Sequence, residues 1–299
     1  MRLPFARRTA RRFVAGETVA EALQAVRQLN EAGMLATLDL LGEHTDDAAA
    51  ANESRLQIQQ MLTELARSGL RSGISIKLTQ IGLKLDENLC AQNLRSILET
   101  ASEHGLFVRI DMEESACVEA TLRLVRQMRA ASLDNVGVVI QTALYRSDAD
   151  IAKLLEEGMR IRLVKGAYME PLTIAYPLKA DVDAAFDRQA DTMLHASLSS
   201  ELAKGKDGAW PPIAALATHD DKRIDFVKRH AEEIGLGKDG YEFQMLYGIR
   251  RDLQQELTAA GYSVRIYVPF GREWYPYFMR RLAERPANLW FFLSNLVRK

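Results

Sequence analysis

Residues 136–168 read VGVVIQTALYRSDADIAKLLEEGMRIRLVKGAY and contain one strand–helix–strand unit. The runs Val136–Ile140 and Ile161–Val164 are short and almost continuously apolar, as are strands of a parallel sheet that helices cover on the outside. Between them, residues 148–157 have the amphipathic spacing of a surface helix. This stretch therefore predicts a β-α-β unit with two parallel strands.

The same pattern extends over most of the 299 residues. Further short apolar runs, with helical patterns between them, lie at 34–40, 74–78, 106–110, 213–217, 242–246 and 264–268. Eight parallel strands alternating with helices in a chain of this length predict an α/β fold, the (β/α)8 TIM barrel. The long connection from Gly166 to Pro212 should carry its own helix near residues 183–202.

A doubly wound sheet is the structural alternative to the barrel. It would place a glycine-rich phosphate-binding turn after an early strand, and the sequence has none there. Gly235, Gly237 and Gly240 do form a Gly-x-Gly-x-x-Gly pattern, but it follows a helical stretch and runs into a strand. A dinucleotide fingerprint has the opposite order, so we predict a loop that ends a helix.

The two ends of the chain add helices to this plan. Thr18 and Glu21 form a capping box, and Gly33 follows the helix that it begins. We therefore divide the chain into an N-terminal arm and helix, 1–33, and a catalytic barrel, 34–299. A last helix is expected from Trp274 to Glu284.

Composition excludes several classes of protein. The formal net charge is −1, so the chain as a whole offers no basic field for nucleic acid. No run approaches the roughly 20 apolar residues of a membrane-spanning helix. The two cysteines and five histidines show no ligand spacing of a known motif, so no metal is expected.

The first residues form a basic arm, containing Arg2, Arg7, Arg8, Arg11 and Arg12 with no acidic residue among them. One interpretation is a solvated, frayed end. The other is weak attraction to an anionic membrane surface.

Polar residues gather where the predicted strands end, which is where barrel enzymes place their active sites. Strands 1 to 4 contribute Asp39, Lys77, Arg109, Asp111 and Gln141, and strands 5 to 8 contribute Arg160, Arg162, Lys165, Thr218, His219, Gln244, Arg265 and Tyr267. Buried charges are costly unless they are paired or bind a ligand. The set predicts a polar, mostly anionic ligand, while salt bridges that only tie strands together are the alternative.

Arg280 and Arg281 lie in the last predicted helix, between Trp274 and Pro286. Two adjacent guanidinium groups can bind one carboxylate through paired hydrogen bonds. A solvated basic helix face is the alternative.

Eight short segments taken together resemble a known family. LDLLGE, SIKLTQ, RIDMEE, IRLVKGAY, ATHD, EFQMLYG, VRIYVPFG and YFMRRLAE occur in order, one on nearly every predicted strand. They resemble the bacterial proline dehydrogenases, including the matching domain of bifunctional proline utilisation A. The resemblance covers the chain from about Arg12 onward.

The resemblance implies a distorted barrel with the last helix over its mouth, which holds FAD without a covalent bond. It implies oxidation of L-proline to Δ1-pyrroline-5-carboxylate, with hydride passing from proline C5 to flavin N5 and electrons then passing to a quinone. It also implies a cytoplasmic protein in proline catabolism, whose peripheral contact with the inner membrane face is left open.

Roles for single residues are likewise implied by the resemblance. Arg162 corresponds to a catalytic group beside flavin N5, and Asp111 to a catalytic residue that also lines the substrate pocket. The remaining substrate residues are Glu43, Lys77, Tyr267, Arg280, Arg281 and Glu284. The arginine pair binds the carboxylate, Glu43 pairs with the first arginine and gates the site, and Glu284 steadies the pair. The FAD contacts are Met112, Gln141, Arg162, Lys165, Gly166, Ala167, Thr218 and His219.

Two other functions remain to be distinguished. A Schiff-base aldolase would use Lys77 or Lys165 as nucleophile, although the neighbouring acidic residues favour the charged ammonium. A non-catalytic barrel would bind an anion through Arg280 and Arg281 without turnover.

Overall fold

The computed structural model describes residues 10–42, 45–202, 205 and 209–283. It is a closed barrel of eight strands, each hydrogen-bonded in parallel to its sequence neighbour, with the first strand also paired to the last. The predicted fold is therefore confirmed. The strands are β1 (Leu35–Leu40), β2 (Ser72–Ile76), β3 (Val108–Ile110), β4 (Val136–Gln141), β5 (Arg160–Val164), β6 (Ala214–Ala217), β7 (Tyr241–Leu246) and β8 (Val264–Phe270).

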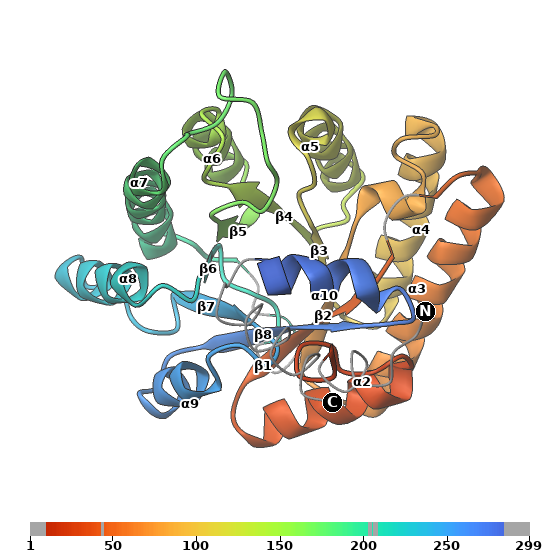
Figure 1. Cartoon of the computed structure of the whole chain (residues 1–299), viewed down its shortest axis with the longest axis horizontal. Coiled ribbons are helices and arrows are strands. Elements are labelled where there is room, and N and C mark those ends of the chain that lie inside the picture. The colour runs from red at the N-terminus through yellow and green to blue at the C-terminus, as the bar shows by residue number, and fades with distance from the viewer. Residues whose placement is uncertain (1–9, 43–44, 203–204, 206–208, 284–299) are drawn as a thin grey trace, which may run out of the picture.

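Helices alternate with the strands and surround the barrel (Figure 1). They are α2 (Val19–Glu31), α3 (Ala48–Ser68), α4 (Glu87–Glu103), α5 (Ser115–Ala130), α6 (Ser147–Glu156), α7 (Lys179–Leu198), α8 (Asp221–Glu233), α9 (Arg251–Ala259) and α10 (Trp274–Ala283), with the short 3-10 helix η1 (Leu78–Ile81) after β2. Apolar faces of the helices and strands form one core, in which Ile58, Val138 and Phe243 are fully buried.

Local sequence signals explain where these helices begin and end. The capping box of Thr18 and Glu21 is present at the start of α2. Asp47 caps α3, which ends at Gly69 in the left-handed conformation. The Gly235-x-Gly-x-x-Gly240 pattern lies in the connection between α8 and β7, so its prediction as a loop is confirmed.

The ring of helices is closed in an unusual way. In a regular barrel the helix after β8 would pack outside the first and last strands. Here α2 packs against β1 and β8, and α10 crosses over the barrel mouth (Figure 1). Phe278 of α10 is fully buried against Phe13, at 6.2 Å between ring centroids, so residues near the start of the chain hold α10 in place.

The amino end of the barrel is closed by packed side chains. Arg109, Arg160 and Arg265 all lie there, so these three strand residues do not share the mouth with the others. Trp210 covers the end, packing on Phe107 at 5.8 Å between centroids. Charged groups in these strands therefore divide between two opposite ends.

Within the described residues, no helix combines the length and apolar character needed to cross a bilayer.

Candidate functional site

A pocket of about 430 Å³ opens at the carboxyl ends of the strands, beneath α10. This volume is within the range of small-molecule sites. Thirteen of the predicted site residues line it: Lys77, Asp111, Met112, Gln141, Arg162, Lys165, Gly166, Ala167, Thr218, His219, Tyr267, Arg280 and Arg281. The other two predicted residues, Glu43 and Glu284, lie outside the described residues.

Asp111, directly after β3, connects the polar groups on one side of the pocket. Its Oδ1 accepts hydrogen bonds from Ser75 Oγ and from Arg162 Nη1, both at 2.9 Å. Its Oδ2 accepts one from the Tyr267 hydroxyl at 2.7 Å and lies 3.6 Å from Lys77 Nζ. The Asp111 carboxylate thereby fixes Arg162, Tyr267 and Lys77, which all border the pocket.

Lys77 also forms an ion pair with Asp39, whose Oδ1 lies 3.1 Å from the ammonium nitrogen. Asp39 is fully buried, and this burial raises the pKa of its carboxyl despite the opposing charge of Lys77. Burial, together with the charges of Asp111 and Asp39, also raises the pKa of Tyr267 well above its ordinary value. Tyr267 is therefore a neutral phenol that donates a hydrogen bond to Asp111.

Arg162 presents a fixed cation in the centre of the pocket. Its Nη1 bonds Asp111, its Nε donates to Gln244 Oε1, and its guanidinium carbon lies 5.3 Å from the centroid of the Tyr267 ring. The amide of Gln244 in turn donates to Glu242, which fixes its orientation. Gln244 was noted at the end of β7 but was not assigned to the site. Gln244 lies two residues after Glu242 on the same strand, so both side chains point into the barrel. This alternation is the sequence signal that could have assigned Gln244 to the site.

The opposite wall is formed by the segments after β4 and β5. Lys165 Nζ lies 2.6 Å from both Asp183 and Asp220. Gly166 follows with φ at +111°, where a Cβ would lie 3.3 Å from Ala143 Cβ. A side chain would be strained at this position, so the backbone borders the pocket directly.

Amide and imidazole groups complete the polar lining. Gln141 Nε2 donates to the carbonyl oxygens of Met112 and Glu113, which leaves its oxygen as the acceptor. His219 Nε2 accepts from the backbone N–H of Leu246 at 3.0 Å, so a neutral ring carries its proton on Nδ1.

The helix α10 brings Arg280 and Arg281 to the same pocket, as expected from the last helix lying over the mouth. The guanidinium carbon of Arg281 lies 5.3 Å from the centroid of Tyr277. Tyr277 was not predicted, although its place one turn before Arg280 and Arg281 signals a shared face. The apolar lining was also missed: Val139, Val164, Ala217, Met245 and Leu246.

The arrangement suits a ligand with an anionic end and a flat apolar part. Lys77, Arg162 and Lys165 give positive charge from the strand ends, and Arg280 and Arg281 give it from α10. Apolar side chains between them can pack against a ring.

Comparisons with known proteins agree on one family. The family described as proline dehydrogenase matches residues 22–293. A proline dehydrogenase of Deinococcus radiodurans is 43% identical, over 97% of this chain and 90% of the relative. Proline dehydrogenase 1 of Bacillus subtilis is 41% identical, over 97% of this chain and 91% of the relative.

A solved structure gives the same answer for the fold. Proline utilization A (PutA) from Bdellovibrio bacteriovorus, inactivated by N-propargylglycine, matches with a TM-score of 0.83 at 25% identity. The match covers 92% of this chain and 32% of that protein, so this chain spans about a third of the longer one.

Proposed function

Since the chain belongs to the proline dehydrogenase family, we propose that it oxidises L-proline to Δ1-pyrroline-5-carboxylate with the help of bound FAD. The observation that carries the proposal is the pocket at the barrel mouth. It brings the arginine pair of α10, Lys77 and the Asp111 group together around one space. Proline oxidation is the first step in the catabolism of this amino acid.

The substrate carboxylate would bind on the side of Lys77, Arg280 and Arg281. A charge-assisted hydrogen bond to a guanidinium is about twice as strong as a neutral one, so this clamp would orient proline as well as hold it. The ring of Tyr267 would pack against the pyrrolidine ring. Its hydroxyl is already fixed by Asp111, so the aromatic face needs no reorganisation when the substrate enters.

The other side of the pocket fits a flavin ring. Apolar walls, the bare backbone at Gly166 and the oxygen of Gln141 offer stacking and hydrogen bonds to a flat heterocycle. The residues that would hold the cofactor are Met112, Gln141, Arg162, Lys165, Gly166, Ala167, Thr218 and His219. A bound flavin would supply the hydride acceptor, N5. FAD, rather than FMN, follows from the family resemblance.

Arg162 would contribute electrostatically. Oxidation removes a hydride from C5 and a proton from the ring nitrogen, which leaves a C=N bond in the product. The group that accepts the hydride would gain negative charge, and the guanidinium of Arg162, fixed by Asp111 and Gln244, would lie close enough to stabilise it. A preorganised cation stabilises this charge without moving during the reaction. Asp111 would act by positioning Arg162, Lys77 and Tyr267 beside the reacting atoms.

The electron acceptor would be a quinone. The segment after the pocket residue Tyr168 carries exposed apolar side chains, among them Met169, Leu172 and Leu178. An exposed apolar segment at the pocket border favours an apolar acceptor and a peripheral contact with the cytoplasmic membrane face.

The contacts of the two lysines argue against the aldolase alternative. Lys77 lies against Asp39 and Asp111, and Lys165 lies against Asp183 and Asp220. A lysine nitrogen held between two carboxylates is poorly placed to attack a carbonyl carbon.

An absorption spectrum during anaerobic titration tests the proposal. We expect a yellow protein whose flavin bands are bleached by L-proline. A protein that remains oxidised with excess L-proline, or that is colourless after reconstitution with FAD, would refute it.

A further inference from the structure

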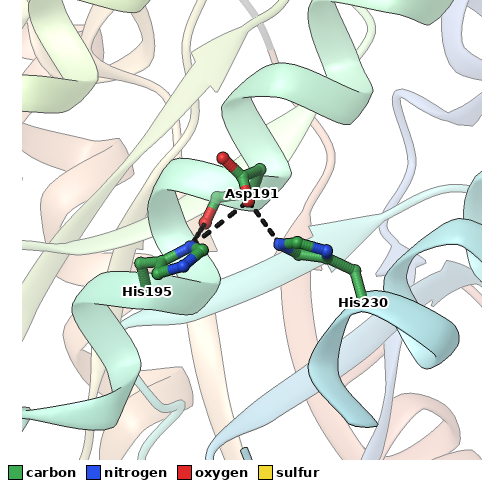
Figure 2. Close-up of side chains that lie close together, drawn as sticks. All are labelled: Asp191, His195 and His230. Atoms are coloured by element: carbon green, nitrogen blue, oxygen red, sulfur yellow. Dashed lines mark hydrogen bonds and ion pairs between the residues drawn. The ribbon is translucent and has the colours of Figure 1, made fainter. Parts of the chain in front are cut away.

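Helices α7 and α8 carry a cluster of three ligand-type side chains that lies outside the pocket. Asp191 and His195 are four residues apart on α7, and His230 faces them from α8 (Figure 2). One ligand atom from each lies within 4.8 Å of the other two. In the described part of the chain, no other three His, Cys, Asp or Glu residues converge in this way.

His230 is held in an orientation that aims Nε2 at the cluster. Its ring stacks on Phe226, at 5.6 Å between centroids and 10° between planes, and its Nδ1 faces Glu233 Oε2 at 3.4 Å. Metal-binding histidines are commonly oriented by a carboxylate on the second ring nitrogen. Nε2 is buried, and its ionic contact with Asp191 Oδ1 lacks hydrogen-bond geometry.

His195 completes the cluster from one turn further along α7. Its Nδ1 lies 3.2 Å from Asp191 Oδ1 and 3.1 Å from the Asp191 backbone oxygen. A small rotation of this exposed ring would turn the nitrogen from the backbone oxygen toward the space between the other two ligands. The three side chains thus offer two imidazole nitrogens and one carboxylate oxygen.

We propose that Asp191, His195 and His230 bind a divalent transition-metal ion of the zinc class. Two imidazoles and one carboxylate suit zinc, nickel or copper, whereas magnesium and calcium prefer oxygen ligands alone. A water molecule would fill the fourth position, since the side chain of His195 is 53% exposed.

The ion would join two helices of the barrel wall. On the same pair of helices, Arg223 of α8 lies 3.3 Å from Asp183 and 2.6 Å from Asp187 of α7. These ion pairs tie one part of the helix pair, and the metal would tie the part around Asp191. Because the site joins two helices and lies away from the substrate pocket, its effect is on stability.

Calorimetric titration of the untagged, EDTA-treated protein with zinc chloride tests the site. We expect one equivalent of zinc to bind and to raise the Tm, with no response to magnesium chloride. Asp191→Asn and His230→Ala should each weaken binding by ~10-fold or more. His104→Ala, at an exposed histidine on α4's C-terminal end, is the matched control and should bind zinc as the parent does.

His195→Ala provides a variant that keeps the helix interface intact, because its side chain is half exposed. It should bind zinc ~10-fold more weakly or worse and keep the parent's Tm without metal. X-ray absorption of the zinc-loaded protein should show two imidazoles per zinc. No zinc binding by the parent, or equal binding by the three variants, would overturn the proposal.

Discussion

Strands β3, β5 and β8 each place an arginine at the amino end of the barrel and a polar residue at or beside the pocket at the other end. At the amino end, Arg109 Nη1 donates to the carbonyl oxygens of Val138 and Arg160, at 2.9 and 2.6 Å. Arg265 Nη1 donates to the carbonyl oxygen of Ala36 at 3.1 Å. The partners there are backbone carbonyl oxygens and, for Arg265, also the buried carboxylate of Glu242 at 2.8 Å, so these arginines hold strands together.

At the mouth, the polar side chains are partnered mainly by one another and border a cavity. Arg162 and Lys77 both contact Asp111, and each also faces the pocket. At the amino end, as at Asp39 in the mouth, burial disfavours the charged form of the side chain. Burial, reinforced by the charge of Arg162, lowers the pKa of Arg109, and burial lowers the pKa of Arg160 to about 10. In this barrel, a charged strand residue therefore marks a ligand site only when its partners are side chains around a cavity.

The first prediction is a substitution that disrupts the packing at the amino end, and it has the largest expected effect. In Gly137→Ala the new Cβ would lie 2.5 Å from the Arg160 carbonyl oxygen and 2.7 Å from Arg109 Nη1. We expect a loss of about 3 kcal/mol in the free energy of unfolding, because a rigid backbone atom must move. Urea denaturation measures this loss.

Gly237→Ala is the control, since its Cβ would meet only the flexible carboxylate of Asp239, at 2.9 Å. An unchanged denaturation midpoint in Gly137→Ala would contradict the close packing at this end.

The second prediction removes a cationic side chain from the pocket at the mouth without disturbing the fold. Arg281→Met should raise the KM for proline by ~100-fold, because it removes a charge-assisted contact worth ~3 kcal/mol. Steady-state kinetics with an artificial acceptor measure it. Arg272→Met, an exposed arginine just before α10, serves as control. Near-normal kinetics in Arg281→Met would mean that the carboxylate binds elsewhere.

The third prediction tests whether Asp111 needs its aromatic partner. Tyr267→Phe keeps the ring and removes the hydroxyl that lies 2.7 Å from Asp111 Oδ2. We expect kcat/KM to fall by ~10-fold, equivalent to about 1.4 kcal/mol, and the Tm to change little. Tyr262→Phe, outside the pocket, is the matched control. A Tm loss with unchanged kinetics would make Tyr267 a structural residue.

The fourth prediction concerns pH and is the smallest. Burial acts to raise the pKa of Asp220, but contacts with Lys165 outweigh it and the pKa is lowered. A carboxyl whose folded pKa lies below its unfolded value stabilises at neutral pH, and this contribution disappears as the pH falls through the folded pKa. Asp220→Asn should therefore lose at most about 1 kcal/mol in the free energy of unfolding at pH 7, and less at a pH below the ordinary aspartate pKa of 3.8. Equal losses at both pH values would contradict the ion pair.

Much of the architecture could be predicted because strands covered on both sides are nearly continuous apolar runs. The segments 136–140 and 161–164 gave β4 and β5 within one or two residues. Pocket residues such as Lys77 and Arg162 could be located because a barrel gathers its strand ends.

Other features depend on contacts that no local pattern contains. Alternation predicts that Arg160 and Arg162 share a side, but not that Arg160 bonds a backbone oxygen at the closed end while Arg162 faces the pocket. The Asp191–His195 pair has no sequence motif, because its third member comes from another helix. Likewise, α2 can pack against β1 and β8 only because α10 does not occupy that outer surface and crosses the barrel mouth instead.

The contact between Phe13 and Phe278 has a consequence for the order in which the protein matures. All eight strands precede α10, so during synthesis the barrel can close before the arginine pair leaves the ribosome. Helix α10 can then pack against Phe13, which has already been synthesised. A polypeptide that stops after Phe270 would have all eight strand segments but would lack Arg280 and Arg281, so the strands alone do not complete the pocket.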